Sequence, residues 1–370
     1  MKLMIFKKNK YIKKLVALSI LASCSSTSKI FIDSPDEYFS KDYPRDLQDI
    51  YSYNAFFFSD LEVIQQKIDN QKLSQSELRD LKLLKKNYQK ILEKNKYQIK
   101  LNPYQENSEE LIKLIYQFNL PISISWDSNI SSVIPAELLL NKIEGFCSSV
   151  YDDSITSINQ EISENHGSTL VIYSDKYASL AKKIISTKSK IFTINYDSSN
   201  FQDFASNILG INFSKDRFNK ITNLNPNQTM NFSPRSRSDI KQIVMLLNPI
   251  EFKAMIPALR YHGGSKFKYI NFISSLEDLN NSLQLLDYED SHTPISFFLS
   301  NKIQNQGTIS IENFLEYGVL SDWLLDQVLK QAAVQSATIY GATGIIFYSM
   351  NSCNRREIPL QKISSDLFST

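Results

Sequence analysis

Short apolar runs alternate with amphipathic stretches over most of the chain from about residue 97 onward. The run Leu170-Val171-Ile172 lacks alternation, which is typical of a parallel strand that is covered on both faces. We predict strands at 120–125, 145–150, 169–173, 190–194, 242–247 and 269–273, helices at 107–118, 152–165, 176–187, 199–209, 249–261 and 311–336, a polar loop at 224–238, and a final hairpin over 341–363. Repeated strand–helix units of this size indicate right-handed crossovers and a parallel sheet, and therefore an α/β fold.

The pattern before residue 97 is different. Residues 25–43 are polar and aromatic without a clear period and predict a tether, whereas apolar residues between 44 and 96 recur at helical spacing. Ser74 followed by Glu77 forms a capping-box signature for the last long helix of this segment. Because the segment shows no repeat of about 34 residues, we do not expect a helical repeat array.

The first 23 residues have the three-part form of a secretory signal. Six lysines precede an apolar run of about eight residues, which is too short to cross a bilayer. Leu21-Ala22-Ser23 then leads into Cys24, whose thiol can take a diacylglycerol and whose freed amine can take a further chain. Two or more acyl chains hold a protein stably on a membrane. We predict cleavage before Cys24 and lipid attachment there, with an ordinary signal peptide and a chance cysteine as the alternative.

Charge and the residues after Cys24 bear on location and partners. Ser25 and Ser26 follow the cysteine, with no aspartate to retain the lipoprotein at the inner membrane, so we expect an outer-membrane lipoprotein that faces the periplasm. Removing the signal leaves 35 basic and 39 acidic residues, a net charge of −4. This charge does not suggest a nucleic-acid partner.

Two further cysteines, Cys147 and Cys353, lie 206 positions apart. An oxidising periplasm permits a disulfide. Sequence alone does not show whether their Cα atoms come within about 7 Å, as a bridge requires. Two buried free thiols therefore remain the alternative.

Catalytic and metal-binding patterns do not stand out. His166, His262 and His292 each occur without a second histidine or a carboxylate at ligand spacing, so we interpret them as structural and predict no metal site and no cofactor. Ser238 and Lys241 formally fit the S-x-x-K motif of penicillin-binding enzymes. The S-D-N and K-T-G partners are missing, so we reject that match and predict that the chain is not an enzyme.

Several segments resemble one family. In residues 235–247, arginines and an aspartate directly precede a predicted apolar strand. Gly341-Ala342-Thr343-Gly344 is similar to a G-x-T-G motif, and residues 355–359 read Arg-Arg-Glu-Ile-Pro. In order and spacing they resemble the C-terminal domain of the LppC family, outer-membrane lipoproteins that activate penicillin-binding proteins, although Leu360 replaces a tryptophan. The residues that carry the motifs are Arg237, Asp239, Pro249, Asp322, Gly341, Gly344, Arg355, Arg356, Glu357 and Pro359. We expect most of them to specify the fold, with fewer making contacts to a partner.

The resemblance implies a pair of type I periplasmic-binding-protein-like α/β lobes. Only residues 24–96 of the mature chain precede Tyr97, so we expect a signal peptide (1–23), a lipidated tether (24–43), a helical segment (44–96) and an α/β domain (97–370) with a reduced N-lobe.

The resemblance also implies a non-catalytic protein that binds a class A penicillin-binding protein and stimulates peptidoglycan synthesis. The alternative is a solute-binding lipoprotein that senses or delivers a small ligand. A cleft binder needs both walls, so the reduced N-lobe favours the partner protein.

Overall fold

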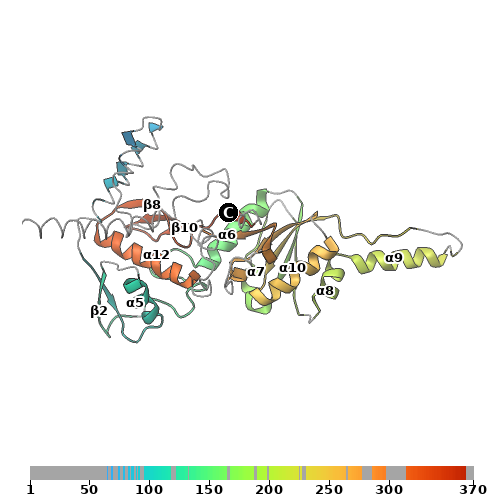
Figure 1. Ribbon diagram of the computed structural model, residues 1–370, viewed down its shortest axis with the longest axis horizontal. Coiled ribbons are helices and arrows are strands. Elements are labelled where there is room, and N and C mark those ends of the chain that lie inside the picture. Colours follow the sequence, from blue (N-terminus) through green and yellow to red (C-terminus); the bar gives the residue numbers. More distant parts are fainter. Residues whose placement is uncertain are drawn as a thin grey trace, which may run out of the picture.

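The computed structural model describes residues 96–363 except 118–121, 132, 165–166, 187–189, 198–199, 225, 227–230, 264–265, 277–285 and 297–313, together with scattered residues between 65 and 91. Figure 1 shows two lobes side by side along the long axis of the molecule. The scattered residues are helical apart from Ser74, whose carbonyl accepts a 3.0 Å hydrogen bond from the Leu78 N–H. This position agrees with the predicted helix start at Ser74, while Glu77 of the predicted capping box lies outside the described residues.

The larger lobe contains a six-stranded sheet in the order β11-β7-β6-β5-β3-β4. Its strands are β3 (Ser168–Tyr173), β4 (Ile191–Asn195), β5 (Ile240–Leu246), β6 (Lys268–Asn271), β7 (Ser291–Pro294) and β11 (Leu360–Lys362). The first five pair in parallel, and β11 is antiparallel to β7. Numbered among themselves, the parallel strands have the order 2-1-3-4-5, which is the order of flavodoxin-like doubly wound sheets.

Helices cover the central strands of this sheet. They are α6 (Val150–Glu164), α7 (Ala178–Ala181), α8 (Phe201–Ile208) and α10 (Pro249–Gly263), with 3₁₀ turns η1 (Asp175–Tyr177) and η3 (Ile273–Leu276) after β3 and β6. Helix α6 packs against α7, and α8 packs against α10. Leu170, Val171 and Ile172 are all fully buried, so both faces of β3 are covered. That burial explains the apolar run without alternation.

The smaller lobe is built from both ends of the described chain. Strands β1 (Tyr97–Leu101) and β2 (Ile122–Trp126) form a parallel pair, and β8 (Ser336–Tyr340), β9 (Ile345–Ser349) and β10 (Arg355–Glu357) form an antiparallel sheet. Helix α12 (Phe314–Gln331) packs against α5 (Ser108–Gln117) and β1. Among the described residues this parallel sheet has two strands, which is small for an α/β lobe and agrees with the predicted reduction of the N-lobe.

The chain passes between the lobes three times. It crosses after β2 through residues 127–149, crosses back between β7 and α12, and returns through Ile358 and Pro359 between β10 and β11. The predicted α/β fold of two periplasmic-binding-protein-like lobes, preceded by helix, is therefore confirmed by the strand order and by this connectivity.

Several predicted elements differ from the structure. The predicted strand at 145–150 is wrong: Gly145 has φ 91°, Phe146 forms an isolated bridge, and the Ser149 hydroxyl accepts a 3.1 Å hydrogen bond from the Asp152 N–H as α6 begins. The predicted helix 311–336 extends too far, because Ala333 has φ 54° and α12 ends at Gln331. A left-handed residue after a helix is usually glycine. No glycine marks this end in the sequence.

The predicted hairpin within 341–363 is confirmed, because β9 and β10 pair antiparallel there. The sheet also includes β8, which was not predicted and pairs with β9 across the Gly341–Gly344 turn, and β11 leaves for the other sheet. The predicted helix 176–187 shortens to η1 and α7. Strands β1 and β7 and helix α9 (Ile211–Leu224) were not predicted.

Candidate functional site

The carboxyl ends of β3, β5 and β6 are where a doubly wound sheet would bind a ligand. Ligands of such folds lie at the point where the strand order reverses, which here is between β3 and β5. In this protein buried side chains occupy that edge. Tyr177 is 1% exposed, Phe272 is fully buried and Tyr151 of α6 is 4% exposed.

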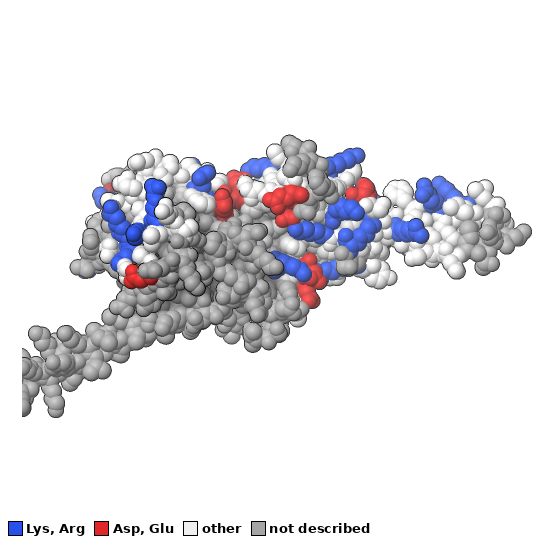
Figure 2. Space-filling view, turned by 90° about the horizontal axis from the view of Figure 1, so that it is seen from above, with Lys and Arg blue, Asp and Glu red and all other residues white. Residues whose placement is uncertain are grey.

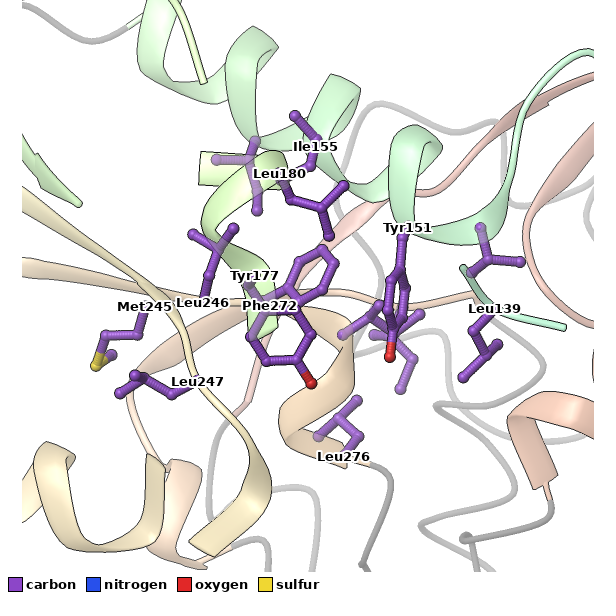
Figure 3. Close-up of a cluster of buried hydrophobic side chains, with 14 of the residues drawn as sticks. Leu139, Tyr151, Ile155, Tyr177, Leu180, Met245, Leu246, Leu247, Phe272 and Leu276 are labelled. Carbon is purple, nitrogen blue, oxygen red and sulfur yellow. The ribbon is translucent and has the colours of Figure 1, made fainter. Parts of the chain in front are cut away.

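The three rings form one cluster (Figure 3). The ring centroids of Tyr151 and Phe272 are 4.8 Å apart and those of Tyr177 and Phe272 are 5.5 Å apart, both in edge-to-face geometry. Leu247 and Leu276 are buried beside them. Each such aromatic pair contributes about 0.5–1.5 kcal/mol beyond its buried area. A ligand at this edge would have to displace a packed core.

A second group of residues joins the lobes. We call it the interlobe junction and define it by the contacts among residues 145–153, the helix α12 and residues 353–358. Cys147 and Cys353 form a disulfide with a Cα–Cα distance of 5.0 Å, which decides between the two alternatives for these cysteines. On either side of it the Cys147 N–H donates to the Asn354 carbonyl at 2.9 Å and the Asn354 N–H donates to the Gly145 carbonyl at 2.8 Å. The first crossing between the lobes is therefore bonded to the segment that directly precedes β10 and the last crossing.

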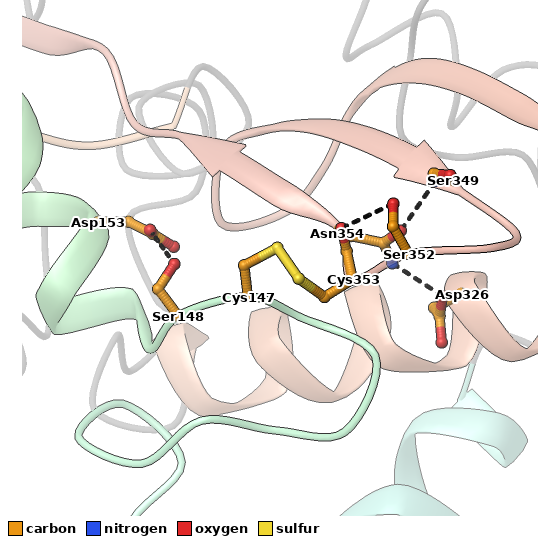
Figure 4. The surroundings of a disulfide bond; sticks show 8 residues. All are labelled: Cys147, Ser148, Asp153, Asp326, Ser349, Ser352, Cys353 and Asn354. Atoms are coloured by element: carbon orange, nitrogen blue, oxygen red, sulfur yellow. Dashed lines mark hydrogen bonds between the residues drawn. A yellow bond between two sulfur atoms is a disulfide. The ribbon is translucent and has the colours of Figure 1, made fainter.

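Figure 4 shows that polar side chains surround this disulfide. The Asn354 amide donates to Asp326 at 2.8 Å, and Lys330 pairs with the same carboxylate at 2.7 Å. Asp153 accepts from the Ser148 hydroxyl on one side. On its other side it pairs with the Arg356 guanidinium at 3.2 Å.

Arg356 lies at the centre of the junction. Its side chain is 1% exposed, and its guanidinium lies 4.5 Å from the centroid of the Phe146 ring. Burial lowers the pKa of Arg356, while the nearby carboxylates of Asp153 and Asp322 oppose that shift. Burial likewise raises the pKa of Asp153, and Arg356 opposes it. The pair is thus a buried charge pair that depends on both partners.

Asp322 holds the turn between β8 and β9. Its carboxylate accepts from the Ala342 N–H at 2.7 Å and from both the N–H (2.9 Å) and the hydroxyl of Thr343. Burial raises the pKa of Asp322, and Arg356 and these hydrogen bonds lower it. A Cβ on Gly341 would lie 2.4 Å from Ile346, and one on Gly344 would lie 2.6 Å from the Glu357 carbonyl. Both glycines are required by close packing.

The structure therefore brings five of the ten motif residues into or beside the interlobe junction: Asp322, Gly341, Gly344, Arg356 and Pro359. The contacts described for them are to other residues of this chain. Arg355 and Glu357 flank Arg356 on the exposed face of β10, and Arg355 lies 5.7 Å from the Phe347 ring.

Three other motif residues lie elsewhere. Arg237 and Asp239 form a two-point ion pair at the entry to β5, with N–O distances of 3.1 and 2.6 Å. The hydrogen bond from Arg237 lowers the pKa of Asp239. Pro249 is the first residue of α10, directly after Asn248, which exchanges hydrogen bonds of 3.0 and 2.8 Å with Glu251. This is a reciprocal helix cap, with proline at its favoured position.

The other residues singled out in the sequence are the lipidation candidate and the three histidines. Cys24 and His166 lie outside the described residues. His262 is in the last turn of α10, and His292 is on β7, where burial lowers its pKa to about 4. Within the described part of the chain, no group of three or more potential metal ligands occurs and no helix is both long and apolar enough to span a bilayer.

An open groove lies at the opposite end of the larger lobe. Helix α9 and residues 231–235 enclose a volume of about 680 Å³, lined by aromatic, aliphatic and arginine side chains. Figure 1 shows that α9 projects from the lobe, away from the smaller lobe. This groove was not predicted, although Phe213, Ile221 and Leu224 recur on one side of a helix at a spacing of eight and three residues.

Comparisons with known proteins give distant likenesses. No protein-family model and no curated protein matches the chain. An ABC transporter solute-binding protein from Clostridium phytofermentas with bound L-rhamnose is 11% identical over 75% of this chain and 81% of its own, with a TM-score of 0.24. An ABC transporter substrate-binding protein from Desulfitobacterium hafniense in complex with Leu is 12% identical over 77% of this chain and 86% of its own, with a TM-score of 0.27. At these TM-scores the likenesses carry no argument about this chain, and the resemblance to the LppC family stays a prediction.

Proposed function

We propose that this chain is a non-catalytic, outer-membrane lipoprotein that binds a class A penicillin-binding protein and stimulates peptidoglycan synthesis. One observation supports a partner protein over a ligand carrier: buried side chains fill the carboxyl edge of the large sheet. Phe272, Tyr177 and Tyr151 occupy the position at which a small ligand would bind. The kind of partner comes from the resemblance of the motif residues to the LppC family.

The proposed location has support from the disulfide. Bridges such as Cys147–Cys353 form and persist in oxidising compartments, including the bacterial periplasm. This agrees with export directed by residues 1–23 and with anchoring through lipid on Cys24. The serines after Cys24 favour the outer membrane.

The proposal of a non-enzyme has support from the buried carboxylates. A catalytic acid or base needs access to a substrate atom within about 3 Å. Asp153, Asp322 and Asp326 are each at most 7% exposed, and each accepts hydrogen bonds from the interlobe junction. Asp153 joins the two lobes through Arg356, whereas Asp322 and Asp326 bind groups of the smaller lobe, and all three carboxylates are buried.

A second candidate function is small-ligand binding. The observation that favours it is the pair of α/β lobes joined by three crossings, because ligand sites commonly lie between such units. Binding to the native state would raise the melting temperature. A thermal-shift screen of amino acids, sugars and muropeptides separates the candidates: we expect no reproducible rise, and a rise of several degrees with one class would favour the ligand carrier.

Co-purification tests the partner directly. Envelopes are crosslinked in the cell, the chain is isolated under denaturing conditions, and the attached proteins are identified. We expect a class A penicillin-binding protein among them, and none with a strain lacking that synthase as the control. Recovery of ABC transporter membrane subunits in its place would favour ligand delivery.

A further inference from the structure

The helix α9 has an apolar side that nothing in the described structure covers. Of its fourteen residues, Ile211 at the base is buried. Phe213 is 77% exposed, Ile221 is 46% exposed and Leu224 is 84% exposed. Single exposed apolar residues are ordinary on protein surfaces. Here three of them lie on one side of a helix that projects from the lobe (Figure 1).

The projecting helix has few contacts of its own. The Phe218 and Phe232 rings stack with centroids 4.2 Å apart, and the Arg235 N–H donates to the Ser214 hydroxyl at 3.2 Å. Helices shorter than about 12–15 residues are marginal in water, and most helical stability comes from packing of an amphipathic face. A partner on the apolar side would supply the packing that α9 lacks.

The charge of this region opposes that of the mature chain. Residues 211–224 and 231–235 contain four basic residues and one acidic residue, a net charge of +3, whereas the mature chain has −4. Figure 2 shows basic side chains along the projecting part. Arg217 and Arg235 line the groove, no acidic side chain of the described residues does, and neither guanidinium forms an ion pair within the described part.

We propose that the groove between α9 and residues 231–235 docks the partner protein through a segment that carries apolar side chains flanked by carboxylates. This inference rests on the proposed function, with the class A synthase as partner. Aromatic residues and arginine are the residue types most enriched in the energetic centres of protein interfaces. An amphipathic segment laid into an apolar groove is a common mode of recognition.

The charge also argues against a symmetric dimer formed through this groove. Two copies packed groove to groove would bring together surfaces of the same sign, which is unfavourable by several kcal/mol when like charges meet. Carboxylates on the partner would instead pair with Arg217 and Arg235, and the apolar side chains would cover Phe213 and Ile221.

Binding of the purified mature lipoprotein to the class A synthase of the same cell, both in detergent, tests the inference. Phe213→Ser with Ile221→Ser should raise Kd at least about tenfold, the loss expected on removing an interface centre. Arg217→Glu with Arg235→Glu should do the same and should remove most of the salt dependence of binding. Matched controls are Ile250→Ser on α10, where the side chain is 75% exposed, and Lys182→Glu, also exposed; both should leave Kd unchanged.

All the altered side chains are exposed, so the melting temperatures should be unchanged, and that result would show that the variants fold. Unchanged Kd in both groove variants overturns the docking surface and leaves the proposed function standing. Failure of the unaltered protein to bind the synthase overturns both. If synthase binding is unchanged and the groove variants instead lose self-association or binding to phosphatidylglycerol vesicles, the occupant is a second copy or a membrane, and the proposal is wrong.

Discussion

Replacement of Arg356 by methionine is the sharpest test of the interlobe junction. The change keeps the unbranched stem of the side chain as far as the position of Nε, and it removes the guanidinium, which faces Asp153 at 3.2 Å and lies 4.5 Å from the centroid of the Phe146 ring. Both charged side chains are at most 8% exposed. Removing one partner of a buried ion pair costs about 3–5 kcal/mol, because the other charge stays buried without compensation. Globular domains have about 5–15 kcal/mol of stability in total, so the loss should be large.

The companion variant isolates the charge. Asp153→Asn combined with Arg356→Met removes both charges and leaves an amide that still accepts from Ser148. We expect the double variant to recover at least about 1 kcal/mol relative to Arg356→Met alone, because no unpaired charge then remains at Asp153. The free energy of unfolding is measured by urea denaturation of the oxidised protein, with Arg355→Met on the exposed face of β10 as the control.

The pH dependence gives an independent check. Without Arg356, burial should raise the pKa of Asp153 and Asp322 further, because the guanidinium that opposes the shift is gone. The folded variant then holds protons that the unfolded chain has lost, so its stability falls as pH rises. The deficit relative to the unaltered protein should therefore be larger at pH 8 than at pH 5. A deficit below about 1 kcal/mol at pH 8, or one that is independent of pH, would refute the reasoning.

Three further predictions concern single side chains. Cys353→Ser should lower the free energy of unfolding by as much as about 5 kcal/mol, the chain-entropy value for a 206-residue loop. A reducing agent should cause the same loss in the unaltered protein and no further loss in the variant. Burial lowers the pKa of His292 to about 4, so on acidification the unfolded chain takes up a proton at this residue before the folded chain does. The free energy of unfolding should therefore fall by at most about 3 kcal/mol between pH 6.5 and 4, and by less in His292→Gln. Cys24→Ala should abolish lipid attachment, and tight outer-membrane fractionation of that variant after high-salt washing would show that the anchor is wrong.

The sequence predicted those parts of the fold that have a strong local signal. The parallel strands at 169–173 and 242–247 could be recognised because buried strands are apolar at successive positions. Strand β7, with the sequence Ser-His-Thr-Pro, has no such run, and its strand conformation comes from pairing with β6 and β11. Helix α9 was missed because polar residues separate its apolar ones and because, among the described residues, Ile211 alone of this helix is buried.

The candidate site was less predictable. The motif residues Asp322, Gly341 and Arg356 were identified by resemblance, but their roles depend on contacts between segments far apart in the chain, such as the hydrogen bond from Ala342 to Asp322. The bridge between Cys147 and Cys353 stayed open for the same reason, since a separation of 206 residues contains no information about distance. The filled edge of the sheet likewise appears only when α6 and η3 are placed against β3 and β5.

The central claim is activation of a synthase, and its most direct test is a rate. The purified mature chain is added to its class A penicillin-binding protein with lipid-linked precursor, and glycan polymerisation and peptide crosslinking are followed over time. An otherwise identical reaction receives the chain unfolded by reduction and heat. We predict that the folded chain raises at least one of the two rates and that the unfolded chain raises neither. If both rates are unchanged by the folded chain, the activator function is contradicted, whatever the fold.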